Sequence, residues 1–197
     1  TMIQHGISVA SSTSKSLCIV DMPANSYKDK KMAIRNAKSI LKKTKCDAVK
    51  IESNGKNYDV ISSIVKSGIP VMGHIGFTPQ HYKKFKAQGL DQKSRIKLLQ
   101  EAKKIEKTGI FSLVLECMTE TLAKEITKLI KIPTIGIGAS NYCDGQILVT
   151  DDMLGLSGFY PKFVKKFVNL NKIIEKGVQK YRTSVLNKKF PAKKNSF

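Results

Sequence analysis

The sequence lacks several features that would place it in a common class of protein. It has no run of 18 apolar residues, so it predicts no membrane-spanning helix. No segment has the pattern of a signal peptide. The four cysteines, Cys18, Cys46, Cys117 and Cys143, lie far apart and form no C-x-x-C pair. This spacing disfavours a disulfide framework and favours a reducing compartment, and we expect a cytoplasmic protein.

Two nucleotide-binding patterns are also missing. The chain contains neither a G-x-G-x-x-G motif nor a P-loop, and Gly136-Ile-Gly138 is only a partial glycine pattern. No short internal repeat is present. A fold prediction therefore depends on the order of strands and helices.

Arginine is scarce in a strongly basic chain. Of the 35 basic residues in 197, only Arg35, Arg95 and Arg182 are arginine, and the formal net charge is +20. A charge this large suggests nucleic acid as a partner. However, base readout and phosphate clamps favour arginine, and the lysines are spread over every predicted helix. We therefore expect solvated lysine-rich faces, with no specific nucleic-acid partner and only a weak, salt-sensitive attraction to polyanions.

Apolar segments alternate with amphipathic ones at a spacing of about 25–40 residues, which is the size of one βα unit. We predict a single domain over residues 1–187 and a basic, flexible tail over 188–197. Six strands are expected, at 17–21, 48–51, 71–74, 111–115, 134–137 and 146–149. Helices are expected at 28–43, 57–66, 92–107, 120–130 and 161–186, the last with a possible break near residue 170.

Further local signals refine this prediction. Asp91 and Thr119 are expected N-caps, residues 1–16 a helix tail or loop, and residues 151–158 a loop or short helix. Because a closed parallel barrel needs eight strands, six units leave two architectures open. One is part of a barrel, and the other is a doubly wound sheet of six strands.

Four of the predicted strands end on chemically active side chains. They are Asp21, the pair Lys50 and Glu52, His74, and Glu116. Each has an ordinary structural explanation. Lys50 and Glu52 can form a surface ion pair, Asp21 can belong to a turn, and His74 can be a core histidine. Glu116 can favour the N-terminus of the next helix through its dipole.

Together these residues indicate an enzyme, since the carboxyl ends of parallel strands converge on one pocket. Asp21 and Glu52 offer hard oxygen ligands for Mg²⁺. Lys50 can neutralise a substrate carboxylate, His74 can hydrogen-bond a substrate, and Glu116 can act as a general base. A hard metal that polarises a carbonyl beside a base is the arrangement for removing a proton α to that carbonyl.

Seven segments resemble the ketopantoate hydroxymethyltransferase family, and the resemblance runs from about residue 1 to residue 191. The segments are Asp21-Met-Pro, Val49-Lys-Ile-Glu52, Gly68-Ile-Pro-Val-Met-Gly-His-Ile-Gly-Phe-Thr-Pro-Gln80, Val114-Leu-Glu-Cys117, Ile132-Pro-Thr-Ile-Gly-Ile-Gly-Ala139, Cys143-Asp-Gly-Gln-Ile-Leu-Val149 and Pro161-Lys-Phe-Val164. Several of them are long and specific, and all occur in the family's order at compatible spacings.

The resemblance implies an α/β fold, a (β/α)₈ TIM barrel of the phosphoenolpyruvate/pyruvate type, with about six βα units in this chain. It implies transfer of a hydroxymethyl group from 5,10-methylenetetrahydrofolate to 3-methyl-2-oxobutanoate, giving 2-dehydropantoate through a Mg²⁺-stabilised enolate. It also implies Mg²⁺ and a decamer. Carried over by position, Asp21 and Glu52 match metal ligands, and Asp21, Lys50 and His74 match substrate-binding residues. Glu116 matches the proton acceptor.

Three departures from the family pattern are visible. The family begins with two further βα units, bearing an Asp-Ser pair, that we do not find here. The loop after His74 reads Lys83-Lys-Phe-Lys-Ala-Gln-Gly89 where the family has a glycine-rich run, and Ser140 stands where the family has glycine. We therefore expect one of three cases: the chain is a fragment, a degraded copy, or one that another chain completes. The alternatives to the transferase are an inactive copy, a 2-oxo-acid lyase of the same superfamily that needs no folate, and a basic nucleic-acid-binding module.

Overall fold

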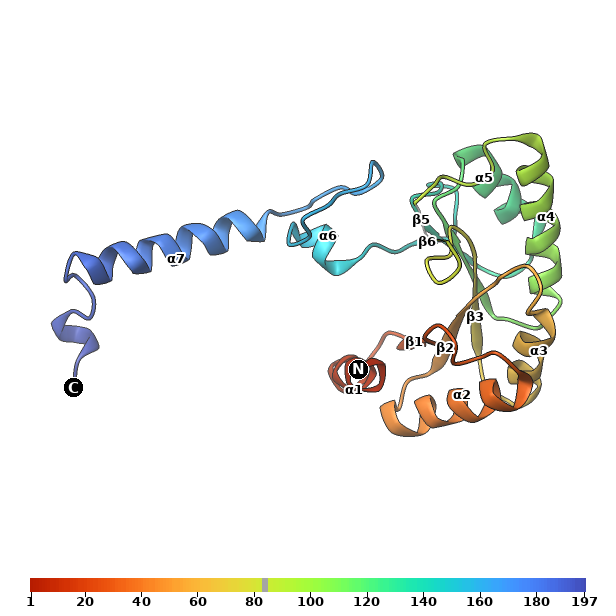
Figure 1. Ribbon diagram of the computed structural model, residues 1–197, viewed down its shortest axis with the longest axis horizontal. Coiled ribbons are helices and arrows are strands. Elements are labelled where there is room, and N and C mark those ends of the chain that lie inside the picture. Colours follow the sequence, from red (N-terminus) through yellow and green to blue (C-terminus); the bar gives the residue numbers. More distant parts are fainter. Residues whose placement is uncertain (83–84) are drawn as a thin grey trace. The chain divides into compact units, whose positions relative to one another are not determined.

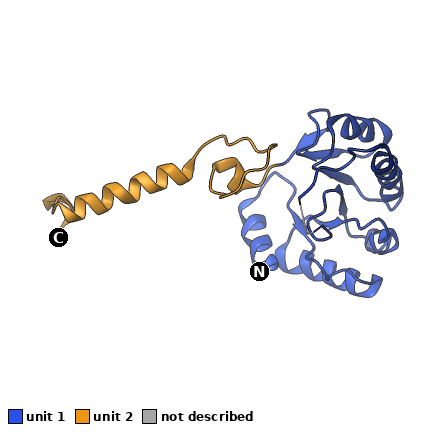
Figure 2. Ribbon diagram, turned by 45° about the horizontal axis from the view of Figure 1, so that its top comes forward, with its two compact units in different colours: residues 1–147 blue, residues 148–197 orange. Residues whose placement is uncertain are grey.

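The computed structural model describes residues 1–82 and 85–197. The chain forms two compact units, residues 1–147 and residues 148–197 (Figure 2). This division falls earlier than the predicted boundary after residue 187, and the single domain over 1–187 stays a prediction. The two units are described separately below.

The first unit is built on one parallel sheet whose strands follow each other in chain order (Figure 1). The six strands are β1 (Ile19–Asp21), β2 (Ala48–Glu52), β3 (Val71–Gly76), β4 (Ser112–Glu116), β5 (Thr134–Ile137) and β6 (Gly145–Gln146). A doubly wound sheet reverses its strand order at a switch point, whereas a barrel adds each strand beside the last. The observed order is therefore that of a barrel segment.

Helices lie along one face of this curved sheet (Figure 1). They are α1 (Met2–Ser12), α2 (Lys30–Thr44), α3 (Tyr58–Lys66), α4 (Gln92–Glu106) and α5 (Glu120–Leu129). The predicted cap of α4 is confirmed, since the Asp91 carboxylate accepts a hydrogen bond from the Ser94 amide at 2.8 Å. Thr119 occupies the N-cap position of α5, but its hydroxyl donates instead to the Gly89 carbonyl.

The core lies between the helices and the sheet. In β2 the apolar residues Val49 and Ile51 are fully buried, and in α2 the residues Ala33, Ala37 and Ile40 face the sheet at helical spacing. The polar groups that end the strands lie beyond this apolar layer. A rigid core under each strand end is what holds such groups in place.

The second unit contains α6 (Thr150–Leu154), α7 (Leu170–Leu186) and a turn of 3₁₀-helix at Lys193–Asn195. The helix predicted over 161–186 was wrong in its first part, because residues 161–169 are irregular and α7 begins at Leu170. The Asn169 side chain accepts a hydrogen bond from the Lys172 amide at 3.2 Å, and this cap starts the helix.

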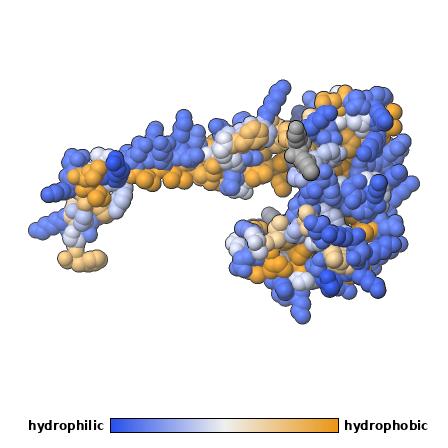
Figure 3. Space-filling view, viewed as in Figure 1, coloured by the Kyte–Doolittle hydropathy of each residue, from blue (hydrophilic) through white to orange (hydrophobic). Residues whose placement is uncertain are grey.

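Helix α7 keeps an exposed apolar side (Figure 3). The residues on it are Ile173, Ile174, Val178, Tyr181 and Val185, and none of them is buried. Within the described part of the chain, no helix is long and apolar enough to cross a membrane.

Candidate active site

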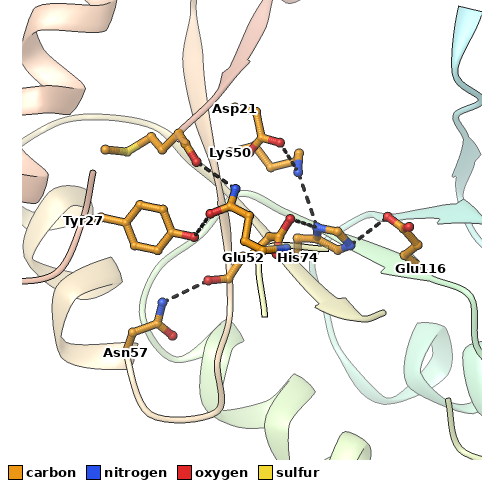
Figure 4. A network of polar contacts seen from close by, with 9 residues as sticks. Asp21, Tyr27, Lys50, Glu52, Asn57, His74 and Glu116 are labelled. Carbon is orange, nitrogen blue, oxygen red and sulfur yellow. Dashed lines mark hydrogen bonds and ion pairs between the residues drawn. The ribbon is translucent and has the colours of Figure 1, made fainter. Parts of the chain in front are cut away.

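The predicted site residues meet at the carboxyl ends of β1 to β4 (Figure 4). The sheet register brings them together, because Asp21 pairs with Lys50 and Glu52 pairs with His74. Glu116 pairs with Gly76, two residues beyond His74 on β3. We call Asp21, Lys50, Glu52, His74 and Glu116 the His74 network. All five residues that the sequence singled out therefore lie in one cluster.

Lys50 connects the first three strands of the network. Its Nζ lies 2.8 Å from Asp21 Oδ2 and 3.4 Å from His74 Nδ1 (Figure 4). A protonated lysine can only donate, so Nδ1 of His74 accepts in this arrangement. The proton of the neutral imidazole is then on Nε2, which faces Glu116.

His74 is the centre of the network and is only 2% exposed. Its Nε2 lies 3.1 Å from Glu116 Oε2. The two atoms are close enough for an ion pair but are not aligned as a hydrogen bond, and Nε2 has no hydrogen-bond partner among the described residues. A buried donor without a partner is costly, so Nε2 is available to donate to a ligand oxygen.

Glu52 is a buried carboxylate held by the loop after β3. Its Oε2 accepts a hydrogen bond from the Gln80 amide at 2.9 Å, and its Oε1 lies 3.9 Å from His74 Nδ1. Burial raises the pKa of Glu52, while the Gln80 amide and His74 oppose this shift. The Gln80 side chain is itself fixed, because it donates to the Met22 carbonyl at 3.0 Å and accepts from the Tyr27 hydroxyl at 2.7 Å.

The residues present fit a hard divalent cation. Asp21 Oδ1 is buried and has no hydrogen-bond partner within the described residues. Asp21 and Glu52 supply carboxylate oxygens, but residues 1–82 and 85–197 contain no group of three metal-binding side chains. Mg²⁺ suits such a set, since it is often held by one or two carboxylates and completes its shell with water and substrate oxygens.

Two unusual backbone conformations hold Glu116. Gly76 has φ +98°, and a Cβ there would lie 2.2 Å from the Glu116 carbonyl oxygen. That same carbonyl accepts a hydrogen bond from the Phe77 amide at 2.8 Å. Cys117 adopts a φ of +49°, and burial together with the Glu116 charge raises its pKa to about 12. Cys117 is thus a packed thiol in a strained turn, and it is held in its neutral form.

Sequence reasoning missed the residues that support the network. Gln80 belongs to one of the segments that resemble the family, but no local sequence pattern showed that its amide would donate to Glu52. Tyr27 carried no signal, because its partner Gln80 is 53 positions away.

Of the two remaining departures, the structure places Ser140 in the loop after β5. Ser140 is buried, where its hydroxyl accepts from the Tyr142 amide and its carbonyl accepts from the Gln146 side chain. Lys83 and Lys84 of the unusual loop lie outside the described residues.

Comparison with known proteins gives a consistent result. Residues 1–193 match the family model described as ketopantoate hydroxymethyltransferase. The chain is 48% identical over 196 residues to the 3-methyl-2-oxobutanoate hydroxymethyltransferase of Pelagibacter ubique, covering all of this chain and 76% of that protein. It is 48% identical over 200 residues to 3-methyl-2-oxobutanoate hydroxymethyltransferase 2 of Zymomonas mobilis, covering all of this chain and 73% of that protein.

A solved structure of a candidate phosphonomutase from Burkholderia cenocepacia shares the fold. The TM-score is 0.55 at 10% sequence identity, and the match covers 74% of this chain and 68% of the other. The predicted α/β barrel class, with about six βα units in this chain, is thereby confirmed. At this level of identity the likeness concerns fold alone.

Proposed function

The chain belongs to the ketopantoate hydroxymethyltransferase family, a family of transferase enzymes. From this premise we propose that it transfers a hydroxymethyl group from 5,10-methylenetetrahydrofolate to 3-methyl-2-oxobutanoate, giving 2-dehydropantoate. The observation that carries the proposal is the His74 network, in which a buried histidine lies between a lysine and two carboxylates. The proposal includes a decameric assembly and a place in the cytoplasm, both by resemblance to the family.

Asp21, Lys50 and His74 bind the 2-oxo acid in this proposal. Asp21 and Glu52 would hold Mg²⁺, which would polarise the 2-keto group and lower the energy needed to remove a proton from C3. Lys50 offers positive charge to the substrate carboxylate from a side chain that is 21% exposed. His74 donates through Nε2, which has no hydrogen-bond partner in the described chain.

Glu116 accepts the proton from C3. The electron pair of the broken C–H bond stays on the substrate as an enolate. Water cleaves the two C–N bonds of the methylene bridge, so that tetrahydrofolate leaves and the carbon is freed at the oxidation level of formaldehyde. The enolate forms the new carbon–carbon bond with this carbon, and the resulting alkoxide takes up a proton to give the hydroxymethyl group. Glu116 suits the role because it is partly exposed, at 17%, while its backbone is held by Gly76 and Phe77.

Solvent deuterium exchange at C3 of 3-methyl-2-oxobutanoate, followed by NMR, tests the proton step directly. We expect exchange that depends on Mg²⁺ and needs no folate. Absence of exchange at high protein concentration, with and without Mg²⁺, would overturn the proposal for this chain and favour an inactive copy of the fold.

The same assay tests the metal assignment. Asp21→Asn removes charge from the oxygen that has no hydrogen-bond partner and should raise the Mg²⁺ concentration for half-maximal exchange by at least about tenfold. Asp59→Asn is a matched control, because Asp59 pairs with Lys30 in an exposed position. An unchanged Mg²⁺ requirement in Asp21→Asn would remove Asp21 from the metal site.

A further inference from the structure

A cavity of about 410 Å³ lies beside the His74 network and is not used by it. Its lining includes Ser53, Gly76, Thr78, Gln88 and Glu101, which come from the ends of β2 and β3, from the loop after β3 and from α4. We call it the Glu101 cavity. Its volume falls in the range of about 300–1,000 Å³ that is usual for small-molecule sites.

Glu101 is the unusual member of this lining. It is only 8% exposed, although it lies on an otherwise lysine-rich helix. Its Oε1 accepts a hydrogen bond from the Ser53 hydroxyl at 2.6 Å. Within the described residues no group donates to Oε2, so one oxygen of a buried carboxylate remains available to the cavity. The charge of Glu101 also reaches Tyr58, whose pKa is raised by burial first and by Glu101 second.

A buried carboxylate with an available oxygen selects for N–H donors and against anions. The remaining walls suit a flat ring, because Leu98 is apolar and the Tyr82 ring is half-exposed at the rim. Thr78 and Gln88 add side chains that can donate and accept. The ligand chemistry is therefore a planar heterocycle with neighbouring N–H groups.

The cavity borders the strand ends that carry the network. Ser53 directly follows Glu52, and Gly76 pairs with Glu116 across β3 and β4. A ring against Gly76 would therefore lie beside the strand end that carries Glu116. The lining also includes Lys97, an exposed cation that suits an acidic tail.

We infer that the Glu101 cavity binds the pterin ring of the folate co-substrate, with Glu101 Oε2 accepting from the ring's 2-amino and neighbouring N–H groups. The acidic tail of the folate lies toward Lys97. This inference rests on the proposed function for the choice of folate, but its test is a binding measurement that needs no turnover.

Titration calorimetry of the full chain with tetrahydrofolate is the test. Glu101→Gln keeps an oxygen for the Ser53 hydroxyl but replaces the second acceptor with an NH₂ group that opposes the ring's donors. We expect the Kd for tetrahydrofolate to rise by at least about tenfold. Glu106→Gln, on the same helix and outside the cavity lining, removes the same charge and should leave Kd within about twofold.

Ser53→Ala separates ligand binding from a purely structural role. It removes the hydrogen bond between Ser53 and Glu101 while leaving the carboxylate in place. If Glu101 only anchors Ser53, Glu101→Gln, which keeps that hydrogen bond, will leave tetrahydrofolate binding unchanged while Ser53→Ala weakens it, and the inference fails. A smaller effect of Ser53→Ala than of Glu101→Gln supports it.

The two proposals can fail separately. Suppose that the chain shows no C3 exchange but binds tetrahydrofolate, and that Glu101→Gln abolishes this binding. This result would support the inference about the cavity and overturn the proposed transferase activity. The inference about the cavity alone fails if C3 exchange occurs but the chain does not bind tetrahydrofolate. It also fails alone if exchange occurs and the Kd for tetrahydrofolate is the same in Glu101→Gln as in the unaltered chain.

Discussion

The His74 network and the Glu101 cavity lie at the same edge of the sheet but are organised in opposite ways. The network brings both signs of charge within 4 Å of one another around a fully buried histidine. The cavity surrounds one carboxylate with hydroxyl, amide and apolar groups and one exposed lysine, and it leaves about 410 Å³ of space. The difference matches the two roles that we propose, because moving a proton needs close, coupled charges whereas holding a ring needs volume and a few directed acceptors.

Glu116→Gln should have the largest effect, and this effect should be confined to the reaction of the His74 network. An amide cannot accept the C3 proton, so the exchange rate should fall by about 10²–10⁴-fold while binding of 3-methyl-2-oxobutanoate persists. NMR exchange rates and a substrate titration measure the two quantities. Glu120→Gln, an exposed change four residues later, should keep the exchange rate. Substantial exchange in Glu116→Gln would refute the base assignment.

Gly76→Ala should damage both sites, because Gly76 borders the cavity and contacts the Glu116 backbone. A Cβ at 2.2 Å from a carbonyl oxygen forces the strand ends apart, in addition to the strain of φ +98°. Exchange and tetrahydrofolate binding should both decline, and urea unfolding should show a lower free energy.

Gly68→Ala is the matched control for this change. Its φ is +82°, but a Cβ there meets nothing within 4 Å. It should lose only the strain energy, about 1–3 kcal/mol. Equal losses in the two variants would show that the close approach to Glu116 does not matter.

Glu52 should make stability depend on pH in the absence of metal. Because burial raises its pKa, the folded chain keeps the Glu52 proton at pH values where the unfolded chain has lost it. The stabilisation is complete below the ordinary glutamate pKa and is lost as pH rises through the folded pKa. In EDTA, the Tm of Glu52→Gln minus that of the unaltered chain should therefore increase between pH 4 and pH 7. Parallel Tm curves would contradict the shift.

Tyr27→Phe should have the smallest effect and should reach the network only through Gln80. The change removes the hydroxyl that donates to the Gln80 side chain, and the free energy of unfolding should fall by about 1 kcal/mol. Since Gln80 positions Glu52, we expect the Mg²⁺ requirement for exchange to rise by about two- to fivefold, with tetrahydrofolate binding unaffected. A change in tetrahydrofolate binding instead would link the two sites and weaken the comparison.

The first five strands and the reactive side chains at their ends could be predicted from the sequence because their signals are local. The sixth strand, predicted at 146–149, was wrong, since β6 covers only Gly145–Gln146 and residues 147–149 are irregular. Apolar runs such as 71–74 and 134–137 are short and bounded by glycine or proline, and the cap at Asp91 lies within three residues of its partner. The helix over 161–169 was predicted wrongly because apolar and lysine residues continue through it, while the Asn169 cap that starts α7 was not recognised.

Contacts between distant residues could not be predicted in the same way. The bond from Ser53 to Glu101 spans 48 positions, and neither residue was a candidate from the sequence. Glu101 looked like one more charge on a solvated helix, since only packing shows that it is buried.

The sequence by itself determined which residues end the strands, because side-chain alternation and apolar runs depend only on near neighbours in the chain. The tertiary structure decided that Lys50 lies between Asp21 and His74, that Gln80 holds Glu52, and that Glu101 faces a cavity. These arrangements depend on strand register and on loops that meet only after the sheet has curved, and no local pattern records such distances.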